Sequence, residues 1–386
     1  MKSVVIVSTA DLYYGNNAAV ARMNLYARAL ALANVDVYML PTEALAAKKK
    51  WIEIEPHVFT LPKERKKTGK GYNPFYVWSL VCKIRKRVKA IKGDVVLLNY
   101  PSTKSLLLDL LLLLFCGHYP MFCEVNEVRR FASGSNGSMR DRLYCQILER
   151  TYKRYKGVVF ISRNIQDYYA SMVRKSVVIP ILSDCDQPLV YSKGLDTLDI
   201  VFVGTVSYAK ENLEELFEGF LLFGKDHLDA RLHLYGTIGD SDKKRLEEFV
   251  ARTNTADTIR YYGAIPHDKV HEVLSSAGAL VLPRTNNKQN HYGFSTKLSE
   301  YAVSGTPIIM TNTGVVSDYF RDGTNCLMCD GYDRNAFKQK FEELARMGIT
   351  EKQEMAEKAY RDAQNHFNYR LYSDRLYKFL IGKNCK

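Results

Sequence analysis

Short apolar runs that alternate with amphipathic stretches are the feature that most constrains the fold of this chain. The apolar runs, each suited to a buried strand, lie at residues 3–8, 35–40, 94–100, 119–125 and 157–162. Stretches with a helical pattern of apolar residues lie between several of them, at 17–33, 103–116, 138–155 and 164–173. A repeated order of strand, helix and strand is typical of a doubly wound parallel sheet with helices on both faces.

The pattern pauses at "PILSDCDQPLVYSKGLDTLD" (180–199), which contains two prolines and has no periodicity. It then resumes, with expected strands at 199–205, 231–237, 258–263, 279–284, 306–311 and 326–328 and expected helices at 211–223, 241–252, 267–276, 332–346, 351–365 and 369–382. A chain of 386 residues is long enough for two cores. We therefore expect an α/β fold of two doubly wound domains, 1–182 and 199–366, joined by a linker at 183–198. Ligands of open parallel sheets bind at the carboxyl ends of the strands, so a ligand is expected in a cleft between the domains.

Positive charge is concentrated in one part of the chain, whose net charge is +13. Residues 48–92 contain 14 Lys and Arg against three Glu. A local basic patch of this kind indicates a polyanionic partner: lipid headgroups, nucleic acid or an anionic acceptor. No motif of groove-reading or single-strand-binding proteins accompanies it, so nucleic acid is not expected.

One segment of the basic window, 73–92, has the pattern of an amphipathic helix. Asn73 is the expected N-cap and Pro74 the first helical residue. The apolar stripe comprises Val77, Val81, Ile84, Val88 and Ile91. Two interpretations remain open: a helix that lays its basic side on an anionic membrane, and an ordinary packed helix with a solvated basic side.

The most apolar segment, "LLLDLLLLLFC" (106–116), predicts a core helix. A membrane-spanning helix needs about 20 apolar residues, and this run is shorter and contains Asp109. The apolar run at the start is too short for a signal peptide. Eight scattered cysteines without zinc-ligand spacing indicate a reduced, cytoplasmic chain.

The stretch "GFSTKLSEYAVSGTPII" (293–309) combines a glycine turn, a short helix and an apolar strand. Lys297 and Glu300 are three residues apart and so share one face of the helix. The free N–H groups of a helix start attract anions, and we expect this start at about Thr296. The pattern indicates a phosphate beside hydroxyl groups, as in a nucleotide or a sugar phosphate. An exposed helix with an ordinary ion pair is the alternative.

The same stretch resembles the donor-site segment of retaining glycosyltransferases of the large family 4 type. Weaker similarities to this family lie in "STADLYYGNNAAVARMNLYARAL", "GVVFISRNIQDYYAS", "VVIPILSD" and "FVGTVSYAKENLEELFEGF". The resemblance covers nearly the whole chain. It implies the two-domain GT-B architecture, a nucleotide-sugar donor, and a C-terminal helix (367–386) that returns to the first domain.

The resemblance also implies roles for particular residues. Glu300 would hold the ribose of the nucleotide, and Lys297 and Lys210 would face its phosphates. The donor site as a whole would comprise Gly15, Asn16, Lys210, Arg284, His291, Gly293, Phe294, Ser295, Thr296, Lys297 and Glu300. Arg22 is either a contact to donor or acceptor phosphate or a surface charge.

Two positions depart from the pattern of the family. The first glutamate of its E-x7-E element is Tyr292 here, and the arginine that often follows the first donor-domain strand is Thr205. A tyrosine does not act as a carboxylate toward the transferred sugar. Arg284 is expected to take over the phosphate contact, and the identity of the sugar is left open.

A group near the anomeric carbon must steady positive charge or take a proton from the acceptor. The segment "CEVNEVRR" (123–130) ends an apolar strand, where such a group is expected. Glu127 is the first candidate, with Asn126 beside it, and Glu124 is the second. The alternative is a structural ion pair between a glutamate and Arg129 or Arg130. No Asp-x-Asp element lies at a strand end, so we expect transfer without a metal ion or another cofactor.

Together these features predict a retaining glycosyltransferase that uses a nucleotide sugar, with UDP favoured. Its acceptor would be a glycan or a lipid-linked glycan at the cytoplasmic face of the membrane, in the synthesis of surface polysaccharide or glycoconjugate. Tyr292 supports an alternative, a catalytically inactive subunit that binds nucleotide sugars. An epimerase or a phosphorylase with the same fold also remains open, because fold alone does not determine function.

Overall fold

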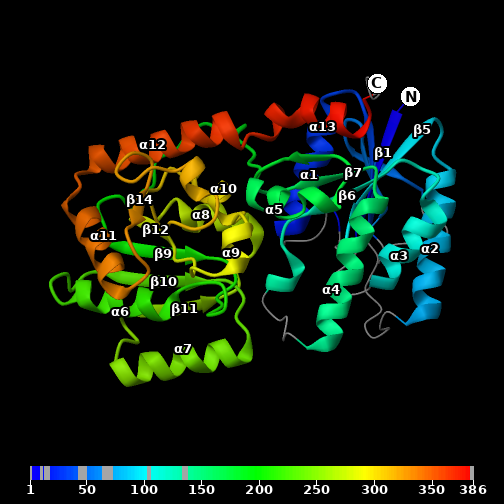
Figure 1. Cartoon of the computed structure of the whole chain (residues 1–386). Coiled ribbons are helices and arrows are strands. Elements are labelled where there is room, and N and C mark those ends of the chain that lie inside the picture. Colours follow the sequence, from blue (N-terminus) through cyan, green and yellow to red (C-terminus); the bar gives the residue numbers. More distant parts are fainter. Residues whose placement is uncertain are drawn as a thin grey trace. The chain divides into compact units, whose positions relative to one another are not determined.

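The computed structural model describes residues 2–8, 12, 18–41, 50–62, 73–101, 106–132 and 138–382. The chain divides into two compact units (Figure 1). Unit 1 comprises residues 1–182 and 368–386, and unit 2 comprises residues 183–367. Residues 183–198, expected to be a linker, thus group with unit 2, whereas the C-terminal segment belongs to unit 1.

Unit 1 contains an eight-stranded sheet with the order β3-β4-β2-β1-β5-β6-β7-β8. The strands are β1 (Lys2–Ser8), β2 (Asp36–Pro41), β3 (Ile52–Glu55), β4 (Val58–Thr60), β5 (Asp94–Tyr100), β6 (Met121–Val125), β7 (Gly157–Phe160) and β8 (Ser176–Val178). All pair in parallel except β3 with β4. The five strands expected from apolar runs are confirmed. The sequence did not reveal β3 and β4, neither of which is a continuous apolar run, whereas β8 overlaps the segment "VVIPILSD" that resembles a strand of the family.

The α-helices of unit 1 are α1 (Ala18–Ala31), α2 (Pro74–Lys89), α3 (Leu106–Cys116), α4 (Met139–Thr151), α5 (Arg163–Tyr168) and α13 (Ser373–Leu380). Short 3₁₀ turns lie at Arg129–Phe131, Tyr152–Arg154, Ala170–Met172 and Tyr369–Tyr372. The C-terminal helix α13 packs against α1. Its residues Leu376 and Leu380 lie in the same core cluster as Tyr26 and Leu30 of α1.

Unit 2 contains a six-stranded parallel sheet with the order β11-β10-β9-β12-β13-β14. The strands are β9 (Asp199–Val203), β10 (Arg231–Tyr235), β11 (Ile259–Gly263), β12 (Ala279–Leu282), β13 (Ile308–Thr311) and β14 (Leu327–Cys329). The helices are α6 (Leu213–Gly224), α7 (Asp240–Thr253), α8 (His267–Leu274), α9 (Lys288–Tyr292), α10 (Lys297–Tyr301), α11 (Arg334–Arg346) and α12 (Ile349–His366), with a 3₁₀ turn at Val316–Asp318. The expected alternation of strands and helices in this half is confirmed.

The strand order of unit 2 shows where its ligand is expected. The first strand, β9, lies between β10 and β12, so the chain runs outward on one side as far as β11 and then returns to the other side. In such a doubly wound sheet, the crevice for ligands opens at the carboxyl ends of the two strands where the order reverses. Here these strands are β9 and β12.

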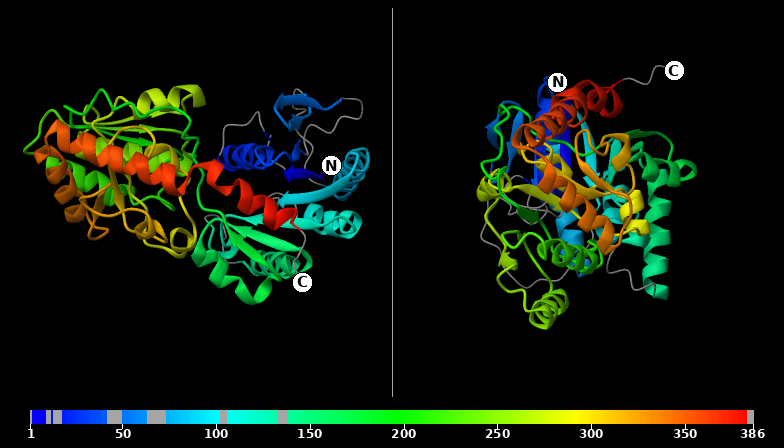
Figure 2. Two further views of the ribbon diagram at one scale, coloured as in Figure 1. Left: turned by 90° about the horizontal axis from the view of Figure 1, so that it is seen from above. Right: turned by 90° about the vertical axis from the view of Figure 1, so that its left-hand side faces the viewer.

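The basic helix α2 uses its apolar stripe for packing. Asn73 caps the helix, since its side chain accepts a hydrogen bond of 2.8 Å from the N–H of Tyr76. The stripe residues Val77, Val81, Ile84 and Val88 are buried, and α2 lies beside α3 (Figures 1 and 2). The apolar stripe is therefore a core contact, and only the remaining surface of α2 is open to a partner.

That remaining surface is basic and carries two aromatic side chains. Phe75 is 88% exposed and Trp78 47% exposed. The described cations of the basic window are Lys50, Lys83, Arg85, Lys86, Arg87, Lys89 and Lys92; the other seven lie outside the described residues. Among the described helices, none combines the length and the apolar character that a membrane crossing requires.

A buried ion pair links three parts of unit 1. The Arg22 Nε donates to Glu124 Oε1 at 2.7 Å, and Nη2 donates to Tyr26 Oη and to the carbonyl of Ile179, both at 2.6 Å. Nη1 donates to the carbonyl of Pro180. The Arg22 and Glu124 side chains are 2% and 0% exposed. The network joins α1, the last residues of β6 and the chain after β8.

This network corrects two expectations from the sequence. Arg22 is not a surface charge, because its side chain is 2% exposed and each of its side-chain nitrogens donates to a protein acceptor. Glu124, the second candidate for the catalytic acid, is the counter-ion of Arg22. A buried charge is stable only when it is paired, so both residues hold the core of unit 1 together.

Arg22→Met should destabilise unit 1 by about 3–5 kcal/mol, because Glu124 would be left as an unpaired buried charge. Guanidinium unfolding followed by tryptophan fluorescence measures this directly, since Trp51 and Trp78, the two tryptophans of the chain, both belong to unit 1. The control is Lys378→Ala, whose side chain is 78% exposed in its pair with Asp374; it should change stability by less than about 0.5 kcal/mol. Equal unfolding midpoints for the two variants would contradict the assignment.

Candidate functional site

The short helix α10 is anchored to the end of β9 by one tyrosine, Tyr301. The Tyr301 hydroxyl accepts the N–H of Val203 at 2.9 Å and donates to the Val203 carbonyl at 3.2 Å. Tyr301 and Leu298 are 1% and 0% exposed. These contacts place Lys297, one helical turn earlier, against the chain as it leaves β9.

Gly204, the first residue after β9, makes room for the Lys297 side chain. Its φ of +146° lies in a region that residues with a Cβ rarely adopt. A Cβ at this position would lie 1.9 Å from Lys297 Cε. The Lys297 ammonium also lies 4.3 Å from the centroid of the Phe202 ring, within the range of a cation–π contact.

Two cations converge on the buried carboxylate of Glu211, in the loop between β9 and α6. Lys297 Nζ lies 2.6 Å and Arg284 Nη1 lies 3.3 Å from the same oxygen, Oε1. The Glu211 side chain is 1% exposed. The positive charge of Lys210, the preceding residue, acts to lower the pKa of both Glu211 and Lys297. Three cations and one acid therefore meet at the carboxyl ends of β9 and β12, where the strand order predicts a ligand.

Burial and charge oppose each other in this cluster. Burial raises the pKa of Glu211, but the charges of Arg284 and Lys297 outweigh it, so the pKa lies below its ordinary value. Burial lowers the pKa of Lys297 to about 8, although the Glu211 carboxylate acts in the opposite direction. The Lys297 ammonium therefore loses its charge as the pH rises through about 8.

Arg284 is held in place by two further side chains. Its Nη2 donates to Ser295 Oγ at 2.7 Å, and its Nη1 donates to Asn290 Oδ1 at 3.5 Å. Asn290 in turn donates to the carbonyl of Lys210 at 2.8 Å. The segment before α10 and the loop after β9 are thus tied together around the guanidinium group. The structure brings together Lys210, Arg284, Ser295 and Lys297, as the sequence indicated.

The sequence analysis did not identify Glu211, and it assigned to α10 an anion-attracting N-terminus that so short a helix does not provide. Glu211 follows Lys210 in an unremarkable acidic stretch, and no pattern in the sequence marks it as the acceptor of two distant cations. The helix that was expected to attract anions with its N-terminus has only five residues, Lys297–Tyr301. Since so short a helix has little macrodipole, the attraction at this site comes from side-chain charges.

The other predicted donor residues have varied surroundings. Burial raises the pKa of Glu300, while the charges of His267 and Lys297 act against this rise. Phe294 is 7% exposed and stacks on Tyr319, with ring centroids 5.3 Å apart, so it supports the turn from within the core. The remaining donor residues are Gly293, which has an ordinary φ of −72°, Thr296, which is half-buried, and His291, which is exposed. Gly15 and Asn16 lie outside the described residues.

The two catalytic candidates of unit 1 follow directly after β6. Glu127 Oε1 lies 3.2 Å from Arg129 Nη1, and the Glu127 side chain is 36% exposed. Asn126 Nδ2 donates to the Tyr100 hydroxyl at 3.1 Å. The ion pair anticipated as the structural alternative is therefore present, and the Glu127 carboxylate remains accessible to solvent.

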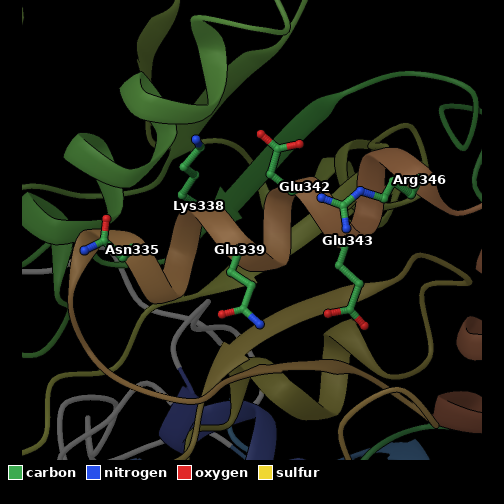
Figure 3. Close-up of a pocket in the computed structure, with 6 residues that line it drawn as sticks. All are labelled: Asn335, Lys338, Gln339, Glu342, Glu343 and Arg346. Atoms are coloured by element: carbon green, nitrogen blue, oxygen red, sulfur yellow. The ribbon is translucent and has the colours of Figure 1, made fainter.

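Two further features of the described residues add no second site. No group of three or more His, Cys, Asp and Glu side chains in this part of the chain is arranged to hold a metal ion. A shallow hollow beside α11 is lined by side chains of that one helix, shown in Figure 3: Asn335, Lys338, Gln339, Glu342, Glu343 and Arg346. The lining combines two cations with two acids, and none of the six side chains is buried.

Part of the chain is similar to known glycosyltransferases. Residues 190–363 match the family described as "Glycosyl transferases group 1". The chain is 26% identical over 194 residues to a 2-deoxystreptamine N-acetyl-D-glucosaminyltransferase from Niallia circulans, covering 46% of this chain and 47% of that protein. It is 22% identical over 152 residues to a D-inositol 3-phosphate glycosyltransferase from Paenarthrobacter aurescens, covering 39% and 36%. The matched region thus spans less than half of each of these curated relatives.

Solved structures match the chain over nearly its full length. A sucrose-phosphate synthase from Thermosynechococcus elongatus superposes with a TM-score of 0.74 at 16% identity and covers 98% of both chains. The HepE protein of Anabaena, in complex with UDP and glucose, superposes with a TM-score of 0.69 at 11% identity and covers 97% of this chain and 98% of its own. At such low identity these similarities establish the fold. The chain has a GT-B-like fold, and its residues 190–363 match the glycosyl transferases group 1 family.

Proposed function

We propose that this protein transfers a sugar from a nucleotide diphosphate sugar, with UDP as the favoured nucleotide, to a glycan or a lipid-linked acceptor. The observation that carries the proposal is the convergence of Lys210, Arg284 and Lys297 at the carboxyl ends of β9 and β12. The group 1 domain and the transferase names of the curated relatives support it. The UDP in the Anabaena structure supports the choice of base.

The cation cluster suits the chemistry of a departing diphosphate. When the bond to the sugar breaks, negative charge develops on the leaving phosphate, and cations fixed in advance stabilise it at little reorganisation cost. Thr205, at the position where family members often have an arginine, supplies no charge. Lys297 and Arg284 bring the missing charge from α10 and from the chain after β12. Glu300, on the same short helix, is the proposed acceptor for the ribose hydroxyls.

Glu127, with Asn126 beside it, is the proposed group near the reacting sugar. Its position after a parallel strand and its accessible carboxylate support this role. The family resemblance supports transfer with retention of configuration. We also propose that the three cations take the part that a metal ion plays elsewhere, so that transfer persists in EDTA.

The proposed location is the inner face of the cell membrane, in the synthesis of surface polysaccharide or glycoconjugate. The surface of α2 that does not pack against the core supports this location. Lys86 and Lys89 are exposed there, and the exposed rings of Phe75 and Trp78 suit the boundary between headgroups and acyl chains.

Lys297→Ala should weaken the binding of UDP-glucose at pH 7 by roughly 10- to 100-fold, because a hydrogen bond to a charged group contributes about 1.5–3 kcal/mol. Calorimetric titration measures the affinity, and melting-temperature shifts with UDP, GDP and dTDP identify the preferred base. Lys244→Ala is the matched control, since its side chain is 78% exposed on α7. Unchanged affinity in Lys297→Ala would exclude the proposed phosphate site.

Wild-type protein supplied with UDP-glucose and membrane extract should release UDP, and Glu127→Gln should lower kcat by about 10²–10⁴-fold while leaving nucleotide affinity unchanged. Glu272→Gln, an exposed glutamate on α8, is the control. If none of the UDP-, GDP- and dTDP-sugars is transferred or hydrolysed although a nucleotide binds, the protein is instead a nucleotide-sugar-binding subunit, as Tyr292 would favour.

Replacing both Lys86 and Lys89 with Glu should reduce the fraction of protein that floats with anionic liposomes at low salt, because each basic residue near the surface contributes about 1 kcal/mol. Lys243 and Lys244 of α7, replaced in the same way, change the net charge equally and should leave flotation unaffected. Absence of wild-type flotation at any salt concentration would refute the membrane location.

A further inference from the structure

Glu211 is the buried acid of the site to which the proposed function assigns no role. Its Oε1 lies within 3.3 Å of both Lys297 Nζ and Arg284 Nη1, so the two cations are necessarily close together. Two like charges at such close range repel each other unless a counter-charge lies between them. The Glu211 carboxylate is that counter-charge.

The backbone holds this carboxylate rigidly. Glu211 pairs with Arg284 through an antiparallel bridge, and the N–H of Thr285 donates to the carbonyl of Lys210 at 3.2 Å. Asn290 Nδ2 donates to the same carbonyl at 2.8 Å. The loop after β9 and the chain after β12 are therefore tied together, with the carboxylate between the two cations.

The second oxygen of Glu211 lacks the hydrogen bonds that a purely structural ion pair would be expected to have. Oε2 is buried, and no donor within the described part of the chain lies at hydrogen-bond distance from it. Stabilising buried ion pairs satisfy their remaining lone pairs, as the Arg22–Glu124 network largely does. An incompletely satisfied buried charge is more typical of a ligand site.

We propose that Glu211 is a positioning residue of the donor site, which holds the Lys297 ammonium and the Arg284 guanidinium side by side so that both face one diphosphate. This inference rests on the proposed function and adds a residue to it. Glu211 does not touch the reacting atoms. It acts through the two cations, by fixing their positions and by favouring the charged form of Lys297.

The charged groups around Lys297 come from several elements. Glu211 and Lys210 approach from the loop after β9, Arg284 from the chain after β12, and Glu300 from α10 itself. The ammonium is thus surrounded by two cations and two acids. The charge of His267, at the start of α8, acts to lower the pKa of Glu300. Of the two acids, only Glu211 has a direct contact with Lys297 Nζ among the described residues.

Glu211→Gln separates two opposite expectations. If Glu211 only cancelled positive charge, its neutralisation would strengthen the attraction of the site for an anion. If Glu211 positions the cations, its neutralisation lets them separate and lets Lys297 lose its proton at a lower pH, so anion binding weakens. The sign of the change in affinity distinguishes the two.

The experiment titrates UDP-glucose by calorimetry from about pH 6 to about pH 8.5, where its diphosphate stays fully ionised. Wild-type affinity should fall as the pH rises through about 8, where Lys297 loses its charge. Glu211→Gln should bind at least about tenfold more weakly at pH 7.5, with a loss that grows between about pH 6 and about pH 8, and Glu211→Asp should recover part of the affinity. Affinity that is equal or tighter in Glu211→Gln, or a loss independent of pH, would overturn the proposal.

A second measurement, made without ligand, tests the role of Glu211 whether or not the protein binds UDP-glucose. Trinitrobenzenesulfonate reacts with neutral amines, so labelling of Lys297 as a function of pH, read by mass spectrometry, reports its protonation. Glu211→Gln should shift this labelling profile to lower pH, whereas an unchanged profile would refute the role of Glu211. Failure of the wild-type protein to bind UDP-glucose would instead contradict the proposed donor, and the labelling result would still decide the role of Glu211.

Discussion

The site of unit 2 depends on the attachment of α10 to the end of β9. A helix of five residues does not persist by itself, because forming the first turn costs more conformational entropy than its few hydrogen bonds return. The Tyr301 hydroxyl replaces that missing stability by bonding both backbone groups of Val203. Since Lys297 precedes Tyr301 by four residues, it lies over Gly204, which has no side chain to displace it. The position of the ammonium thus depends on the buried side chain of Tyr301 and on the absence of a side chain at Gly204.

The two units contain buried ion pairs that differ in one respect. In unit 1, every nitrogen of Arg22 has an acceptor, and both oxygens of Glu124 have a donor. In unit 2, both cations share one oxygen of Glu211, and the other oxygen has no donor among the described residues. The first arrangement is complete without a ligand and holds three segments of a core together. The second leaves hydrogen-bonding capacity open at the carboxyl edge of a parallel sheet, where such folds bind their ligands.

Much of the fold could be predicted from the sequence because buried parallel strands are apolar along their whole length and are separated by helices. The runs at 94–100 and 199–205 correspond to β5 and β9 almost residue for residue. The edge strand β3, with the sequence "IEIE", could not be found in this way, since it is only four residues long, largely exposed and not a continuous apolar run. For the site, Lys210, Ser295 and Lys297 were predicted from the family resemblance and Arg284 from its place at a strand end, and the structure brings them together.

The sequence by itself determined the class of the fold, the division into two α/β units and the segment that carries Lys297, because these depend on local patterns of apolar residues and glycines. Only the tertiary structure decided which charges meet. Arg22 and Glu124 are 102 positions apart, and Glu211 and Lys297 are 86 apart. A local sequence pattern cannot reveal such pairs, because the free-energy cost of burying a charge depends on which residues surround it in the folded structure. For that reason Arg22 is a core residue rather than a surface charge, and Glu211 is the acid on which the cations of the site converge.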